Sequence, residues 1–84
     1  MPEVVVGKVT HWFGKISVAI VKLTDSLRVG QTIHFKGSHT DFTQVVESMQ
    51  IEHKNVQEAK AGDDIGIKVS EKVREGDEAL LVTE

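Results

Sequence analysis

The chain has 84 residues, of which 39% are hydrophobic and 27% charged, and its 13 acidic and 10 basic side chains give a formal charge of −3. A chain this short is expected to form one domain over residues 1–84, which excludes a multidomain enzyme. It has no cysteine, which excludes disulfides and thiolate chemistry and favours a reducing cytoplasm. No apolar run approaches the roughly 20 residues of a membrane helix, and the acidic start does not resemble a signal peptide. The sequence therefore predicts a cytoplasmic protein without membrane contact.

Short apolar runs separated by glycines predict an all-β fold. A glycine turn at Gly14 and Lys15 joins the first two runs, and Gly30 can supply a positive φ before the third. A long loop over residues 55–64 precedes the fifth run. Strands are expected over residues 4–13, 16–23, 31–36, 40–53, 65–70 and 79–82.

A two-residue turn beginning at Gly37 is expected between the third and fourth strands, because glycine in the first position is typical of a type II′ hairpin. The turn determines the register of the hairpin. It predicts that Ile33 faces Phe42 on the inner side, while His34 lies opposite Asp41 on the outer side.

The fourth expected strand carries apolar residues in both alternation phases, with Phe42 and Val46 in one and Met49 and Ile51 in the other. One uninterrupted strand cannot bury them all, so a β-bulge is expected within residues 43–47. Bulges bend strands at barrel corners, and closure removes exposed sheet edges. We therefore expect a small closed six- to seven-stranded β-barrel.

The residue pattern contains no recognisable nucleotide or catalytic motif. Val9 and Ile16 stand where a phosphate-binding loop around Gly14 and Lys15 needs a glycine and a hydroxyl side chain, so no nucleotide is expected. Asp63 and the acidic residue after it suit a glycine-rich turn, and no serine has a nucleophile motif around it. We therefore expect neither a catalytic site nor a cofactor.

Four histidines could in principle bind a metal, because imidazole suits zinc, copper or nickel. Their spacing is better explained by ordinary surface positions on the strands, and no metal site is expected. These residues are His11, His34, His39 and His53.

Trp12 and Phe13 are adjacent in a strand, so one ring points inward and the other outward. An outward aromatic ring near lysines can stack on a base or on a partner side chain. The candidate partner-binding residues are therefore Trp12, expected to be exposed, and Lys15 at the hairpin tip, with Lys54 and Lys60 in the long loop.

Four sequence blocks resemble, in order, the second β-barrel domain of translational GTPases such as elongation factor Tu. The hairpin over residues 14–23 is longer than in that family and more similar to the C-terminal barrel of collagenase-like peptidases, a family linked to tRNA hydroxylation. The blocks are Val-Gly-Lys-Val over residues 6–9, Leu-Arg-Val-Gly-Gln-Thr-Ile over 27–33, Ala-Gly-Asp-Asp-Ile-Gly-Ile over 61–67 and Val-Arg-Glu-Gly-Asp over 73–77.

The resemblance implies the translation-protein type of barrel, here as a stand-alone binding module. In elongation factor Tu an acidic residue and an aromatic residue hold the aminoacyl end of tRNA, but Gln50 and Glu52 occupy the corresponding places and do not match. The expected function is a non-enzymatic, translation factor-like barrel that docks on a protein or ribonucleoprotein partner. The alternative is an accessory subunit, supplied in trans, of an RNA-modifying or peptidase-like enzyme. Direct RNA binding is expected to be weak or absent because of the charge of −3.

Overall fold

The computed structural model describes residues 3–82, which form two antiparallel sheets. The larger sheet has the strand order β5-β4-β10-β1-β2-β9-β6-β7, and the smaller one pairs β3 with β8. Residues 3–82 include no helix with the length and hydropathy needed to cross a membrane. The strands are β1 (Glu3–Phe13), β2 (Val18–Leu23), β3 (Leu27–Arg28), β4 (Thr32–Lys36), β5 (Asp41–Val45), β6 (Met49–Ile51), β7 (Lys54–Val56), β8 (Glu58–Ala59), β9 (Asp64–Lys68) and β10 (Glu78–Val82).

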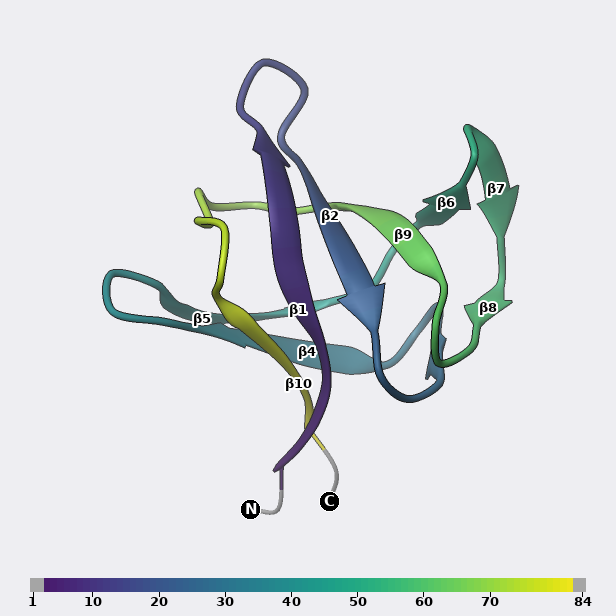
Figure 1. The fold of residues 1–84 in the computed structure, drawn as a ribbon, viewed down its shortest axis with the longest axis horizontal. Helices are drawn as coiled ribbons and strands as arrows, with labels where there is room; N and C mark the ends of the chain where they lie inside the picture. Colours follow the sequence, from purple (N-terminus) through teal and green to yellow (C-terminus); the bar gives the residue numbers. More distant parts are fainter. Residues whose placement is uncertain (1–2, 83–84) are drawn as a thin grey trace.

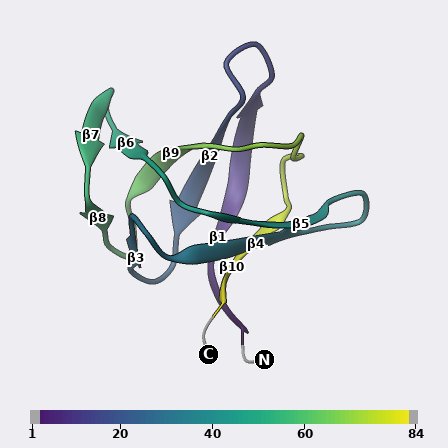
Figure 2. The same ribbon diagram turned by 180° about the vertical axis from the view of Figure 1, so that it is seen from behind.

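The strand β1 runs the length of the molecule and links its two ends. At one end its hairpin with β2 projects from the body, while at the other its first residue Glu3 pairs with Val82 of β10 (Figure 1). The reverse view shows β3 and β8 together beside the turn that leaves β2 (Figure 2). Two separate surfaces, the hairpin end and the terminal end, therefore flank the core.

The core follows the period-2 alternation of the strands. Ile33 and Phe35 of β4 are buried while His34 between them faces outward, and Ile65 and Ile67 of β9 are buried on either side of Gly66. The predictions for these two strands are confirmed. The largest fully buried side chains are Phe35, Leu23, Leu27, Ile33, Met49, Ile65 and Ile67.

Gly7 occupies a position in β1 where no side chain fits. The pairing of β1 with β10 shifts register between Val5 and Gly7. A Cβ atom at Gly7 would lie 2.6 Å from Cγ1 of Val21 and 2.8 Å from the carbonyl oxygen of Lys22. The close approach of β2 at this bulge therefore requires glycine.

The predicted register of the β4–β5 hairpin is wrong by two residues. Phe35, not Ile33, pairs with Phe42, and the two rings lie 5.4 Å apart between centroids. The turn lies one residue later than predicted. The amide of Gly37 donates to the carbonyl oxygen of Thr40 at 2.7 Å and the amide of Thr40 donates to that of Gly37 at 3.4 Å, so Ser38 and His39 form the loop. His34 consequently pairs with Thr43, and Asp41 is its diagonal neighbour.

The single strand expected over residues 40–53 is also wrong, because β5 ends at Val45 and the next strand, β6, begins only at Met49. The amide of Val46 donates to the carbonyl oxygen of Gln31, and the amide of Gly30 donates to that of Val46, both at 2.8 Å. Val46 is buried, and β6 then begins at Met49, which is buried as well. A break, rather than a bulge within one ladder, brings both apolar phases to the core.

The all-β prediction is confirmed, whereas a closed ring of six or seven strands is not found. Within residues 3–82 the eight-stranded sheet ends at β5 and β7, and no backbone ladder joins those edges. Instead, the side chain of Gln44 on β5 bridges to the segment after β9. Its amide nitrogen donates to the carbonyl oxygen of Lys68 at 2.9 Å, and its oxygen accepts from the amide of Ser70 at 2.8 Å.

Candidate functional site

A groove of about 310 Å³ lies on the outer face of the sheet at the hairpin end. Its floor comes from β2 and β9, one wall from the β1–β2 hairpin and the other from the β6–β7 turn. We call it the hairpin groove. Its lining residues are Phe13, Ile16, Val18, Ile20, Gln50, Glu52, His53, Asp64 and Gly66.

The floor of the hairpin groove is open because Gly66 has no side chain. Gly66 pairs with Ile20 on one side and with Gln50 on the other. A Cβ atom there would lie 3.4 Å from Cγ1 of Val18 and 3.5 Å from Cδ1 of Ile20, which is ordinary contact distance. The glycine therefore leaves two aliphatic side chains uncovered where a larger residue would fit.

The hairpin wall presents two apolar side chains to solvent. Phe13 is 48% exposed and Ile16 is 61% exposed. The ring of Phe13 also stacks with that of His11 at 6.3 Å between centroids. Such exposure at a projecting loop is typical of interaction surfaces rather than of a packed core.

A β-bulge decides which aromatic residue points outward. The pairing of β1 with β2 shifts register between Val9 and His11, so Thr10 is an extra residue and the alternation reverses. Trp12 therefore pairs with the buried Ala19 and packs against the core, while Phe13 faces outward.

The opposite wall is a tight turn built from two residues in the left-handed region. Glu52 and His53 have φ values of 51° and 66°, and the pair Ile51 and Lys54 closes the turn. This is the position of a two-residue type I′ hairpin, in which asparagine and glycine are usual. Left-handed residues with a full side chain are uncommon and occur preferentially at functional sites.

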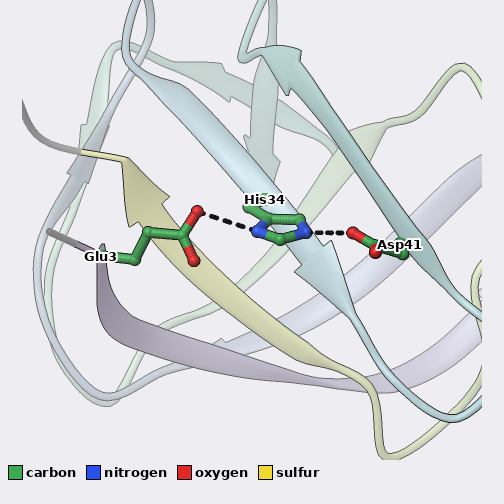
Figure 3. Close-up of polar contacts among 3 residues, drawn as sticks. All are labelled: Glu3, His34 and Asp41. Atoms are coloured by element: carbon green, nitrogen blue, oxygen red, sulfur yellow. Dashed lines mark hydrogen bonds and ion pairs between the residues drawn. The ribbon is translucent and has the colours of Figure 1, made fainter. Parts of the chain in front are cut away.

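A second polar feature, at the terminal end, joins Glu3, His34 and Asp41 (Figure 3). His34 Nδ1 lies 2.9 Å from Oε2 of Glu3, and Nε2 lies 2.5 Å from Oδ1 of Asp41. The His34 side chain is only 14% exposed. The cluster connects β1, β4 and β5 across the intervening β10.

The two carboxylates favour the charged form of the imidazole. The hydrogen bond to Asp41 raises the pKa of His34 above its usual 6.5, Glu3 acts in the same direction, and partial burial opposes them. Because both ring nitrogens face a carboxylate, neither is free to take a proton from a substrate. Within the described chain no group of three or more histidine or acidic side chains is placed to hold a metal ion.

A larger hollow of about 440 Å³ lies at the seam beside Gln44 and Ser70. The polar atoms of Gln44 there already bond to the backbone of Lys68 and Ser70. The hollow therefore results from the gap between β5 and the segment after β9. Because its Gln44 polar atoms already have backbone partners, the hairpin groove is the better candidate site.

The predicted binding residues lie in different places. Lys15 is exposed in the hairpin loop, next to Ile16, and Lys54 is exposed next to His53, so both border the hairpin groove. Lys60 lies in the turn before β9. The expectation of an exposed Trp12 is wrong, because the bulge at Thr10 turns its ring toward the core, where it is partly buried. Their role in binding a partner stays a prediction.

Sequence reasoning missed the outward ring of Phe13, the side chain of Ile16 and the open floor at Gly66. A signal existed for the last of these, because an isolated glycine within a strand pattern often marks a close approach or an open position. The turn at Glu52 and His53 carries no such signal.

Comparison with known proteins gives a partial match to a protease. The chain matches no protein-family model. A Methanocaldococcus jannaschii protein described as an uncharacterized protease is 41% identical over 83 residues, which cover 98% of this chain. The chain spans only 20% of that relative.

Two solved structures share the fold. Both are C-terminal domains of a Geobacillus thermoleovorans protein assigned to the U32 peptidases, one of them as a selenomethionine variant. Their TM-scores are 0.85 and 0.88 at 22% and 21% sequence identity, and the matches cover 89% and 94% of this chain and 95% and 92% of theirs. The chain has the fold of that C-terminal domain. The expected likeness to the barrel of collagenase-like peptidases is thus confirmed for the fold, and the likeness to elongation factor Tu stays a prediction.

Proposed function

We propose that this chain is a non-catalytic accessory module of a U32 peptidase-type enzyme and that it binds a polypeptide segment in the hairpin groove. The observation that carries the proposal is the 41% identical match, which takes in nearly all of this chain but one fifth of the relative. A segment matched over its whole length within a longer protease has the extent of one module of that protein. The C-terminal domains with the same fold support this division.

The shape and chemistry of the hairpin groove favour an extended polypeptide as the ligand. Its floor at Val18, Ile20 and Gly66 is apolar, which suits a buried side chain, and its rim carries the polar groups of Gln50 and Asp64. Ligand sites commonly combine an apolar floor with a few polar groups that orient the ligand. A polypeptide is also the class of molecule on which a protease acts.

Binding to a ribonucleoprotein, which the resemblance to elongation factor Tu implies, is less well supported. The carboxylates of Glu52 and Asp64 line the groove and repel phosphate, and Lys15 and Lys54 lie at its border rather than in its lining. Direct binding of free RNA is therefore proposed to be weak or absent, in keeping with the charge of −3.

The test is peptide binding by the chain alone. Fluorescently labelled, unstructured peptides from a digest of reduced casein are titrated with the protein, and anisotropy reports binding. Phe13→Ser removes the exposed ring of the hairpin wall, and Val45→Ser removes a similarly exposed side chain of the edge strand β5, outside the groove lining, as a matched control.

We expect saturable binding that Phe13→Ser weakens by roughly tenfold, the loss of one interfacial aromatic anchor, while Val45→Ser leaves it unchanged. No saturable binding by the wild-type chain, or equal loss in both variants, contradicts the peptide-binding proposal. Tight binding of tRNA or rRNA fragments at physiological salt favours the ribonucleoprotein reading instead.

A further inference from the structure

Most of the exposed large hydrophobic residues gather at the two ends of the molecule. Phe13 and Ile16 belong to the hairpin, whereas Val4 and Val5 lie near the start of β1 at the terminal end and Val45 ends the edge strand β5 beside the seam hollow. β1 joins these ends, and at about 3.3 Å per residue it separates them by roughly 25 Å. One ligand in the hairpin groove does not cover the terminal end.

Four neighbouring strands build a continuous surface at the terminal end. Val5 of β1 pairs with Leu80 of β10, which pairs with His34 of β4, so the three side chains lie in one row on the outer face. Val82 extends this face along β10, and Val45 extends it along the edge strand β5. We call this surface, made of Val5, Val45, Leu80 and Val82 around His34, the terminal face.

The terminal face combines apolar rows with a polar centre. The carboxylates of Glu3 and Asp41 hold His34 on both ring nitrogens. With His34 protonated, the three groups carry one net negative charge. An apolar surface with a satisfied polar group at its centre has the composition of a specific interface, in which the polar group selects the partner.

The position of the chain ends indicates what covers this face. In the Geobacillus protein the domain of the same fold is C-terminal, so the remainder of that protein precedes the domain and joins it ahead of β1. The corresponding residue here, Glu3, lies at the edge of the terminal face and pairs with Val82. In the M. jannaschii relative four fifths of the protein lie outside the matched region.

Resting on the proposed function, we infer that the terminal face packs against the peptidase part of a U32 peptidase-type protein. The hairpin groove then points away from that part and stays open to a polypeptide. A second copy of this chain suits the face less well, because a symmetric contact would place two negative clusters against each other.

The test uses the fact that the chain has no cysteine. Val45→Cys places a thiol on the terminal face, and Ile16→Cys places one on the hairpin as the control. Both substitutions are small and lie at exposed positions, so the fold is retained. Each variant is prepared as the isolated chain and as a chimera in which it replaces the matched region of the M. jannaschii protease. Maleimide labelling of each site is followed by mass spectrometry.

We expect Val45→Cys to react roughly tenfold more slowly in the chimera than in the isolated chain, because thiol reactivity follows exposure, while Ile16→Cys reacts equally in both. Equal labelling of Val45→Cys in the two forms overturns the inference. Slower labelling of Val45→Cys in the isolated chain at high concentration identifies a second copy as the occupant and also overturns it. Since peptide binding is measured on the chain alone, failure of this inference is distinguishable from failure of the peptide-binding proposal.

Discussion

The side chain of Gln44 on β5 bonds to the backbone of Ser70, where no backbone ladder joins the two segments. Its side-chain oxygen accepts the amide of Ser70 at 2.8 Å, and its side-chain nitrogen donates to the carbonyl oxygen of Lys68 at 2.9 Å. An edge strand and a loop are thereby joined as if by a ladder, although the sheet order leaves them unpaired. The residue thus joins the edge strand β5 to the end of β9 and the segment after it, where no ladder pairs them in the described chain.

Gln44→Ala is expected to lower the free energy of unfolding by about 1–2 kcal/mol, because two backbone groups lose their partners and a net hydrogen bond contributes about 1 kcal/mol. Urea denaturation followed by circular dichroism measures the change. Gln57→Ala, at an exposed glutamine between β7 and β8, is the control and should change stability by less than about 0.5 kcal/mol. Equal effects of the two variants would show that the bridge at the seam is not stabilising.

The Glu3–His34–Asp41 cluster makes stability depend on pH. The hydrogen bond to Asp41 raises the pKa of His34 above its usual 6.5 in the folded chain. The folded state therefore binds the proton of His34 more tightly than the unfolded state does. The resulting contribution to the free energy of unfolding is fully present below about pH 6.5 and is lost as the pH rises through the folded pKa of His34. We expect the stability difference between wild type and His34→Gln to be larger near pH 6 than near pH 9.

The measurement is urea denaturation of both proteins at the two pH values, in one buffer series of constant ionic strength. His39→Gln, in the exposed β4–β5 turn, is the matched control and should follow the wild type at both pH values. If the free energy of unfolding changed between the two pH values by the same amount in the wild type and in His34→Gln, the cluster would be ruled out as the source of the pH dependence.

The error in the β4–β5 register shows what strand alternation can and cannot determine. A shift by two residues keeps every side chain on its own face, so the apolar pattern fits Ile33 opposite Phe42 as well as Phe35 opposite Phe42. Only the position of the turn distinguishes the two registers, and Gly37 and Thr40 close it one residue later than the glycine pattern predicts. Packing decides it in the structure, where the Phe35 and Phe42 rings lie 5.4 Å apart and the carboxylate of Asp77 approaches Gly37.

The candidate site was predictable in its place but not in its residues. The hairpin was identified from its adjacent aromatic residues, yet simple alternation continued from Val9 points Trp12 outward. The bulge at Thr10 reverses the phase and points Phe13 outward instead. Nothing in the residue pattern around Thr10 marks this bulge, which lies where β1 pairs with β2.

A comparison of two glycines tests the hairpin groove independently of its walls. Both Gly7 and Gly66 lie in strands, but a Cβ atom at Gly7 would lie 2.6 Å from Val21 and 2.8 Å from the backbone of Lys22. At Gly66 the nearest atoms, from Val18 and Ile20, are 3.4 and 3.5 Å away. Gly7→Ala is therefore expected to lower the free energy of unfolding by about 1–3 kcal/mol, the usual cost of overpacking.

Gly66→Ala should instead raise the free energy of unfolding by about 0.5 kcal/mol, because alanine fits and restricts the unfolded chain. The same methyl group covers the floor between Val18 and Ile20, so peptide binding should weaken while stability does not. Urea denaturation and the anisotropy titration measure the two effects on the same samples. A lower free energy of unfolding in Gly66→Ala would show that the groove has no space for a methyl group above Gly66. An unchanged peptide affinity in a stable Gly66→Ala variant would show that the peptide binds elsewhere.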